Sequence, residues 1–318
     1  MTATEKDVRS GAVRFRVLRV YPAARIVIVN GGDLAVEDPG PESGFPVIVH
    51  HGAGSRHLFP PAVAEGQQKG FRLIGYDRPG CGGSTAMPGR VIADCAADVQ
   101  AIMTELGITR AAVWGSSGGG PYALATASML PGAVTAVCLF ASIGPYGMPG
   151  LDFAQGPGGE DLREEVRKMF EEPERARAEF RARSAITLAE RGSARWWLAK
   201  WGDRAEQDAA HSRDWAEYLA TCTRDVLRSG DSGSFDDEGS WEDNLAFYRP
   251  WGFDLASILA PVSLWHGLQD FVPVAHARWL ADRIPNVTTH FPADQDHTNV
   301  EENNRAAAFA WLNAQRPD

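Results

Sequence analysis

Cysteine is scarce in this chain: it holds four in 318 residues, and no two of them are separated by only two positions. That spacing disfavours a zinc site or a redox dithiol, and we expect neither a metal nor a cofactor. No stretch of 18 apolar residues occurs, so the sequence predicts no membrane span and no membrane partner. The first nine residues lack the apolar core of a secretory signal, and scattered thiols suit a reducing compartment. Together these features predict a cytoplasmic protein.

Positive charge is also in short supply. The chain has 31 Lys and Arg residues against 41 Asp and Glu, which gives a formal net charge of −10. Nucleic-acid binding depends on basic side chains that displace counterions from phosphates, so we do not expect a nucleic-acid partner. A small molecule of neutral or weakly polar character is the expected ligand. The oligomeric state is left unknown by the sequence.

Short apolar runs recur along the chain and alternate with longer helical patterns. Eight of these runs are typical of strands: 25–30, 33–37, 46–50, 71–76, 111–114, 134–140, 262–265 and 287–291. Helical patterns lie at 91–106, 275–284 and 303–314. Runs that are apolar throughout suit strands covered on both faces of a parallel sheet. The sequence therefore predicts an α/β fold with an eight-stranded, mostly parallel sheet flanked by helices.

The alternation stops between residues 147 and 250, where the chain is charged and helical. Six of the ten tryptophans lie in this segment or at its edge. Such side chains supply large apolar areas, which suit either a substrate pocket or contact with a neighbouring domain. We expect residues 1–146 and 251–318 to form a core domain, with 1–23 as an N-terminal extension. Residues 147–250 are expected to form a helical cap, or lid, inserted into it.

The pentapeptide GSSGG at 115–119 follows the strand at 111–114 and precedes a helical stretch. A strand, a Gly-x-Ser-x-Gly turn and a helix in that order are typical of a nucleophile elbow. The turn would expose the Ser117 hydroxyl above the N-terminus of the next helix, where it can attack a carbonyl carbon. Ser116 is a weaker candidate, because the residue two positions before it is Trp114.

A serine hydroxyl needs a base to take its proton, usually a histidine oriented by a carboxylate. In hydrolases with a parallel sheet the chain order is serine, then acid, then histidine. Asp270 follows the strand at 262–265, and His297 lies in the loop after the last strand. Ser117, Asp270 and His297 are therefore the predicted catalytic residues. Asp296 is adjacent to the histidine and is expected to cap the last helix instead.

The oxyanion formed in acyl transfer needs two fixed hydrogen-bond donors. The N–H of Gly118, directly after the nucleophile, is one predicted donor. The second is the N–H of Ala53 in the loop at 50–56, where small residues let the backbone approach the reacting carbonyl. A glycine-rich turn without a catalytic role is the alternative for this loop. Arg78 is expected to form a structural ion pair or to anchor a loop.

Five stretches carry a family resemblance: HHGAGS at 50–55, YDRPGCGGS at 76–84, GSSGGGPYALA at 115–125, HGLQDFVPV at 266–274 and DQDHTN at 294–299. On these the chain resembles the serine-dependent, capped members of the α/β-hydrolase superfamily. The resemblance implies the α/β-hydrolase fold, with its eight-stranded sheet and helical cap. It also implies a serine hydrolase, carboxylesterase-like, that cleaves an ester or related acyl bond of a small, partly apolar molecule through an acyl-enzyme.

The same fold hosts other chemistries, so alternatives stay open. Ser117 disfavours haloalkane dehalogenases and epoxide hydrolases, which use an aspartate nucleophile. Proline iminopeptidases usually carry His-Gly-Gly-Pro-Gly in the oxyanion loop, where this chain reads HGAGS at 51–55. A peptidase of that kind is therefore an open but less favoured alternative. Cofactor-free perhydrolases, carbon–carbon bond hydrolases, non-hydrolytic lyases and ligand receptors can keep the same three residues.

Overall fold

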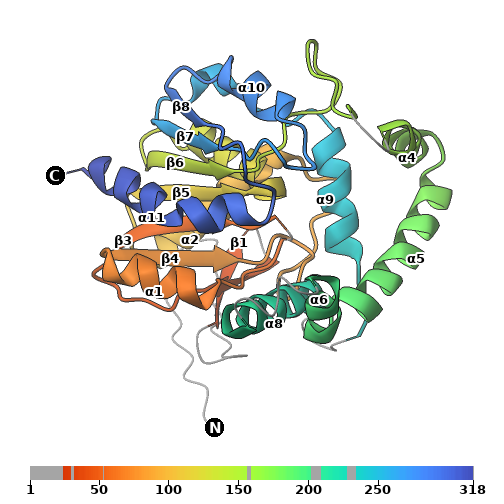
Figure 1. The fold of residues 1–318 in the computed structure, drawn as a ribbon, viewed down its shortest axis with the longest axis horizontal. Helices are drawn as coiled ribbons and strands as arrows, with labels where there is room; N and C mark the ends of the chain where they lie inside the picture. Colours follow the sequence, from red (N-terminus) through yellow and green to blue (C-terminus); the bar gives the residue numbers. More distant parts are fainter. Residues whose placement is uncertain are drawn as a thin grey trace, which may run out of the picture.

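The computed structural model describes residues 24–29, 32–52, 54–155, 159–201, 209–227 and 234–317. The predicted N-terminal extension lies outside these residues. In the described part, a central sheet has helices on both faces, and a second group of helices lies to one side of it (Figure 1). None of the described helices combines the length and the apolarity needed to span a bilayer.

The described residues form one sheet of eight strands in the order β1-β2-β4-β3-β5-β6-β7-β8. The strands are β1 Ala24–Val29, β2 Gly32–Glu37, β3 Phe45–His50, β4 Phe71–Tyr76, β5 Ala111–Ser116, β6 Val134–Phe140, β7 Val262–Trp265 and β8 Val287–His290. Strand β2 pairs antiparallel with β1 and with β4, and every other neighbouring pair is parallel. The predicted eight-stranded, mostly parallel sheet is confirmed.

Two apolar layers cover the sheet, because successive side chains of a strand point to opposite faces. In β5, Val113 joins the cluster on one face and Trp114 joins the cluster on the other. The first face is covered by α2 (Cys95–Glu105), α3 (Gly120–Met129) and α10 (Ala275–Ala281). The second is covered by α1 (Pro60–Gln68) and α11 (Asn299–Ala314). Cover on both faces explains why the inner strands are mostly apolar on both sides.

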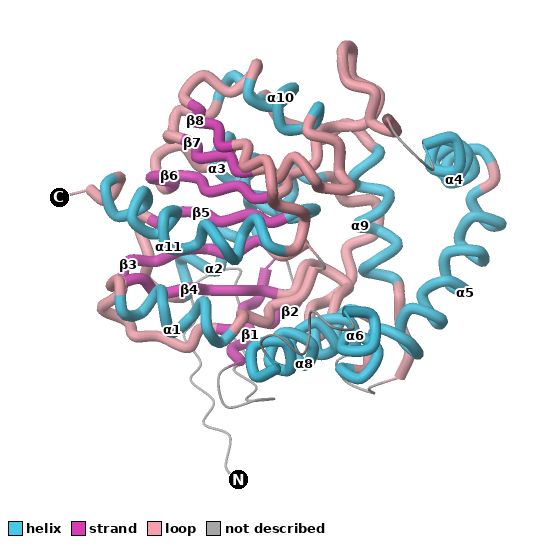
Figure 2. Tube along the Cα trace, viewed as in Figure 1, coloured by secondary structure: helices cyan, strands magenta, loops and turns pink. Residues whose placement is uncertain are grey.

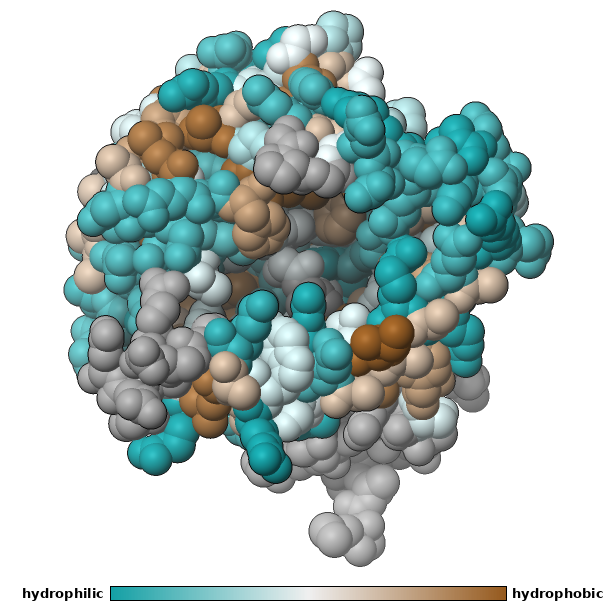
Figure 3. Space-filling view, turned by 45° about the vertical axis from the view of Figure 1, so that its right-hand side comes forward, coloured by the Kyte–Doolittle hydropathy of each residue, from teal (hydrophilic) through white to brown (hydrophobic). Residues whose placement is uncertain are grey.

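Between β6 and β7 the chain leaves the sheet and forms a group of helices, which we call the insert. Its described helices are α4 (Gly159–Glu171), α5 (Pro173–Arg191), α6 (Ala194–Trp201), α8 (Ala209–Val226) and α9 (Glu238–Tyr248). Helix α9 lies next to the sheet, while α4 and α5 are farther out (Figure 2). The outer surface of the insert is mainly hydrophilic, and the molecule is hollowed between the insert and the rest (Figure 3). The division into core and cap at residues 147 and 250 stays a prediction.

Buried charges connect α9 to the sheet domain. Asp243 of α9 accepts hydrogen bonds from Arg78, at 2.7 Å from Nη2, and from Tyr122, at 3.0 Å from the hydroxyl. Arg90 forms a second short ion pair with the same carboxylate. Burial opposes ionisation of Asp243, but the two guanidinium groups outweigh it and hold the pKa at about 2. The insert is therefore attached by a network that is costly to break.

Helix α8 is attached by a separate set of charges around His57. The ring Nε2 lies 2.7 Å from the Asp225 carboxylate of α8, and Nδ1 lies 3.1 Å from the carboxylate of Glu37 at the end of β2. Burial lowers the pKa of His57, but the hydrogen bonds to Asp225 and Glu37 outweigh it and raise the pKa to about 9. A protonated ring donates to both carboxylates at once.

Candidate active site

Strand β5 ends in a tight turn that presents Ser117. The residue has φ of +54°, a left-handed conformation that costs a residue other than glycine about 1–3 kcal/mol. A Cβ placed on Gly115 would meet the Ala123 Cβ at 2.8 Å, and one on Gly119 would overlap the carbonyl oxygen of His50. Both flanking positions therefore require glycine. The short 3-10 helix η2 (Ser117–Gly119) and helix α3 follow, so Ser117 stands at a helix N-terminus.

The structure brings Ser117, His297 and Asp270 together from three separate elements. His297, in the loop before α11, places Nε2 3.0 Å from Ser117 Oγ. Its Nδ1 lies 2.9 and 3.0 Å from the two carboxylate oxygens of Asp270, in the loop after β7. A carboxylate only accepts hydrogen bonds, so Nδ1 carries the proton and Nε2 can accept from the serine hydroxyl. The Asp270 side chain is fully buried and that of His297 is 19% exposed.

Neighbouring groups hold this arrangement in place. Asp270 Oδ1 also accepts the backbone N–H of Val272 at 2.8 Å. Asp296, predicted to cap the last helix, accepts the backbone N–H groups of Thr298 and Asn299 at its start. The exposed ring of Phe271 lies 4.3 Å from the His297 ring, centroid to centroid. The histidine is therefore held by its carboxylate and by the loop that Asp296 stabilises.

The loop after β3 lies directly beside the serine. A Cβ on Gly52 would meet Ser117 Cβ at 3.2 Å, so the backbone passes close to the nucleophile. Arg78 donates to the carbonyl oxygens of His51 and Gly52, and pairs with the insert through Asp243. This is the loop anchor and the ion pair that the sequence predicts for Arg78.

The oxyanion donors stay predictions. Ala53 lies outside the described residues. Gly118 is buried directly after the nucleophile, and a Cβ there would meet the Phe247 ring at 2.9 Å and the Gly52 carbonyl oxygen at 3.2 Å. The backbone at Gly118 therefore approaches both the loop and α9.

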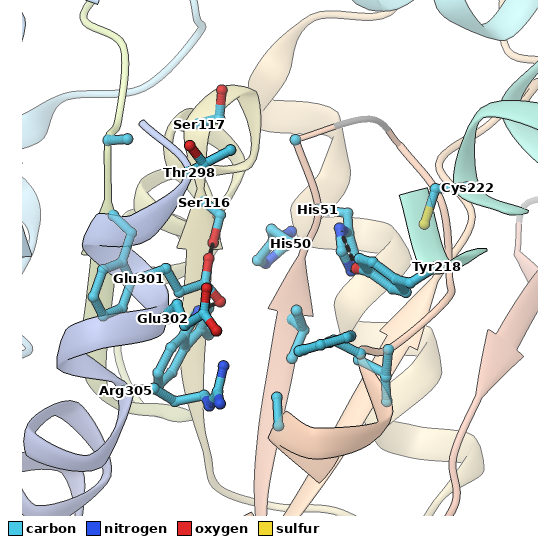
Figure 4. A pocket seen from close by; sticks show the side chains of 18 of the residues that line it. His50, His51, Ser116, Ser117, Tyr218, Cys222, Thr298, Glu301, Glu302 and Arg305 are labelled. Carbon is cyan, nitrogen blue, oxygen red and sulfur yellow. Dashed lines mark hydrogen bonds between the residues drawn. The ribbon is translucent and has the colours of Figure 1, made fainter. Parts of the chain in front are cut away.

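A cavity of about 220 Å³ lies beside Ser117 and His297, and its walls come from the sheet, α1, α8 and α11 (Figure 4). Aromatic and aliphatic side chains form most of the lining, among them Phe59, Trp114, Phe140, Trp215, Leu219 and Phe309. The Trp215 and Tyr218 rings of α8 stack with centroids 5.1 Å apart, and Phe59 meets Trp215 edge-on. The cavity suits an apolar group of a small ligand.

The insert tryptophans have different roles. Trp215 lines the cavity, whereas Trp241 and Trp251 are buried in apolar clusters that stabilise the fold. Trp241 packs among residues of the insert, and Trp251 packs against the sheet cluster. A role of the insert tryptophans in binding substrate stays a prediction. The side chain of Trp201 lies outside the described residues.

Polar groups also line the cavity. Figure 4 shows Glu301, Glu302 and Arg305 of α11 on one side, and His51 and Tyr218 on the other. Burial raises the pKa of Glu301 and lowers the pKa of His51 to about 4, so the imidazole is neutral near pH 7. No group of three or more His, Cys, Asp and Glu side chains within the described ranges is placed to hold a metal ion.

A family model of the alpha/beta hydrolase fold matches residues 46–304. The chain belongs to this family. Several solved structures resemble it over nearly the whole length of both chains. The esterase RhEst1 from Rhodococcus sp. ECU1013 is 23% identical, with 92% of this chain and 98% of that chain covered at a TM-score of 0.60.

Two further structures are similar to this alpha/beta hydrolase to the same degree. The enol-lactonase from Burkholderia xenovorans LB400 is 21% identical, with 91% of this chain and 98% of that chain covered at a TM-score of 0.60. A thermophilic esterase from Thermogutta terrifontis is 20% identical, with 92% and 99% covered at a TM-score of 0.62. At these identities the likeness shows the fold alone.

Several residues of the site carry no sequence motif. Tyr218 and Trp215 lie on α8, about a hundred residues after the elbow, and nothing in their spacing connects them to it. Glu301 follows His297 by four residues, but His297 precedes α11, so helical spacing does not relate the two side chains.

Proposed function

We propose that this alpha/beta hydrolase is a serine hydrolase that cleaves an ester or related acyl bond of a small, partly apolar molecule. The observation that carries the proposal is the continuous line of hydrogen bonds from Asp270 through His297 to Ser117. A carboxylate, an imidazole and a hydroxyl in that order form the arrangement that activates a serine nucleophile. Their position at the carboxyl ends of parallel strands is where α/β sheets bind ligands.

In the proposed reaction, Ser117 Oγ attacks the carbonyl carbon while His297 Nε2 takes its proton. Asp270 stabilises the imidazolium that forms and keeps the ring in one orientation. The N–H groups of Gly118 and Ala53 are the proposed donors to the oxyanion, each of which would contribute about 3 kcal/mol to the transition state. When the intermediate collapses, the alcohol leaves with the proton from His297. The acyl group stays on Ser117.

Water completes the proposed cycle. His297 takes a proton from a water molecule, which attacks the carbonyl of the acyl-enzyme. When the second tetrahedral intermediate collapses, the protonated His297 returns the proton to Ser117 Oγ, and the carboxylic acid is released. The mainly apolar lining of the cavity beside Ser117 supports a substrate with an apolar group, because burial of such a group is favourable by about 25 cal/mol per Å².

A panel of 4-nitrophenyl esters with graded acyl chains tests the proposal. We expect the enzyme to hydrolyse esters of short and medium chains, and Ser117→Ala to lower kcat by about ten-thousandfold or more. Thermal unfolding of the variant checks that it is folded. Ester hydrolysis by Ser117→Ala at the parent rate would contradict the proposal.

A further inference from the structure

Glu301 lines the cavity wall and holds its carboxyl group against β5. Its Oε1 accepts a hydrogen bond from Trp114 Nε1 at 3.1 Å, and its Oε2 accepts a short hydrogen bond from Ser116 Oγ. Both donors are neutral groups. The guanidinium of Arg305, one turn further along α11, bonds instead to Glu65, with Nε 2.9 Å from Oε2.

A carboxyl group in this position keeps unused hydrogen-bonding capacity. Each carboxylate oxygen can accept two hydrogen bonds, and each Glu301 oxygen has one described donor. Burial raises the pKa of Glu301, against the hydrogen bonds from Ser116 and Trp114 and the charge of Arg305. A charged group in mainly apolar surroundings is costly unless it is paired. A ligand that donates a hydrogen bond to Glu301 would offset part of this cost.

The carboxyl group is within reach of a substrate held at the nucleophile. Ser116 and Ser117 are neighbours, and consecutive Cα atoms are about 3.8 Å apart. With the Ser116 hydroxyl bonded to Glu301, the carboxyl group lies within about 9 Å of Ser117 Cα. A chain of about six atoms beyond the carbonyl carbon covers this distance. Its methylene groups would pass the stacked rings of Trp114 and Phe140.

We propose that the cavity selects substrates whose apolar acyl group ends in a hydrogen-bond donor, which binds Glu301. This proposal rests on the serine hydrolase function proposed above. The donor is a hydroxyl or an ammonium group. We place it on the acyl side because Glu301 is bonded to the residue next to the nucleophile, and the nucleophile retains the acyl group. Glu301 is thereby a specificity-determining residue, and Trp114 and Ser116 position its carboxyl group.

Three 4-nitrophenyl esters with chains of equal length test this proposal: the heptanoate, the 6-hydroxyhexanoate and the 6-aminohexanoate. We expect kcat/KM for at least one donor-bearing ester to exceed that for the heptanoate by about tenfold, the effect of one hydrogen bond to a charged group. The better of the two donor esters distinguishes a neutral from a cationic group. The heptanoate as the best of the three would overturn the proposal.

Glu301→Gln tests the assignment to this residue. The indole N–H of Trp114 only donates, so the new amide oxygen faces it and the amide NH2 group takes the place of Oε2. The variant loses the negative charge and one of the two acceptor oxygens, so the preference for donor-bearing esters should fall to about one or below. Glu302→Gln tests the other carboxylate of the cavity lining, because it removes one negative charge from the same helical turn without touching the Trp114 and Ser116 contacts. Preference kept in Glu301→Gln, or lost in Glu302→Gln, overturns the assignment.

Binding without turnover separates this proposal from the proposed function. Hydrolysis of the heptanoate ester by the parent and its loss in Ser117→Ala report on the serine mechanism alone. Calorimetric titration of Ser117→Ala with heptanamide, 6-hydroxyhexanamide and 6-aminohexanamide reports on Glu301 alone. A donor-bearing amide should bind about tenfold more tightly than heptanamide, whether or not the enzyme cleaves esters. Equal or weaker binding of both donor-bearing amides contradicts the selection that we propose.

Discussion

Arg78 and Asp243 are 165 positions apart in the chain and form a buried ion pair, in which Nε and Nη2 donate to Oδ2 at 2.9 and 2.7 Å. The same guanidinium donates to the carbonyl oxygens of His51 and Gly52, beside Ser117. One side chain therefore connects α9 of the insert to the loop that passes the nucleophile. Loss of the pair should affect both the stability of the fold and the shape of the site.

Asp243→Asn should lower the free energy of unfolding by about 3–5 kcal/mol, because Arg78 and Arg90 would keep buried charges without their counterion. Urea denaturation measures the change. Glu172→Gln is the control, since Glu172 forms exposed ion pairs with Arg167 and Arg175 and should have a far smaller effect. A loss of stability in Asp243→Asn no larger than in the control would show that the buried network contributes nothing.

Gly119→Ala should distort the elbow. The added Cβ would overlap the backbone oxygen of His50, which cannot move without shifting β3. We expect kcat for a 4-nitrophenyl ester to fall by about a hundredfold or more, because small displacements of the nucleophile are costly. Gly132→Ala is the matched control, as its Cβ would meet no atom within 4 Å. Equal activity in the two variants would refute the steric reading of the turn.

The attachment of α8 should weaken as the pH rises. The His57 pKa is raised from 6.5 to about 9, so the folded state binds this proton more tightly than the unfolded state. The resulting stabilisation is complete below pH 6.5 and is lost as the pH rises to about 9. The stability difference between the parent and His57→Gln, from urea denaturation, should therefore shrink between about pH 6 and about pH 9.5. A stability difference between the two proteins that grows with pH would contradict a raised pKa of His57 in the folded state.

The strands were predictable from the sequence because the inner ones are buried on both faces and are therefore short, mostly apolar runs. Helix α1 was not predicted. Gly66 interrupts the helical pattern of its sequence, and a Cβ there would meet Leu73 Cδ1 at 2.6 Å. The glycine is thus required by close packing on the sheet, which only the fold reveals. The last helix begins at Asn299, four residues before the predicted start, because Asp296 caps it earlier.

Ser117, Asp270 and His297 were predictable because each follows a strand and lies in a recognisable motif. The partner of Arg78 was not, since Asp243 lies in a polar helical stretch whose sequence resembles an exposed surface. Tyr218 and Glu301 reach the cavity only because α8 and α11 pack beside the ends of β3 and β5. Contacts that depend on tertiary packing leave no local pattern in a single sequence.

Asp270→Asn should lower kcat by about a thousandfold to ten-thousandfold with little change in KM. An amide can donate its NH2 group to Nδ1, which favours the tautomer that has its proton on Nε2 and cannot accept from Ser117. Steady-state kinetics with a 4-nitrophenyl ester measure the effect, and circular dichroism checks the fold. A loss smaller than about tenfold would exclude Asp270 from the proposed role.

Intact-mass analysis after treatment with a fluorophosphonate probe tests the activated serine most directly, because the adjacent Ser116 supplies its own control. The parent and Ser116→Ala should each gain the mass of one phosphonyl group, and Ser117→Ala should gain none. Labelling of Ser117→Ala, or an unlabelled parent, would contradict the proposed nucleophile; the latter result would favour a ligand receptor on the same fold.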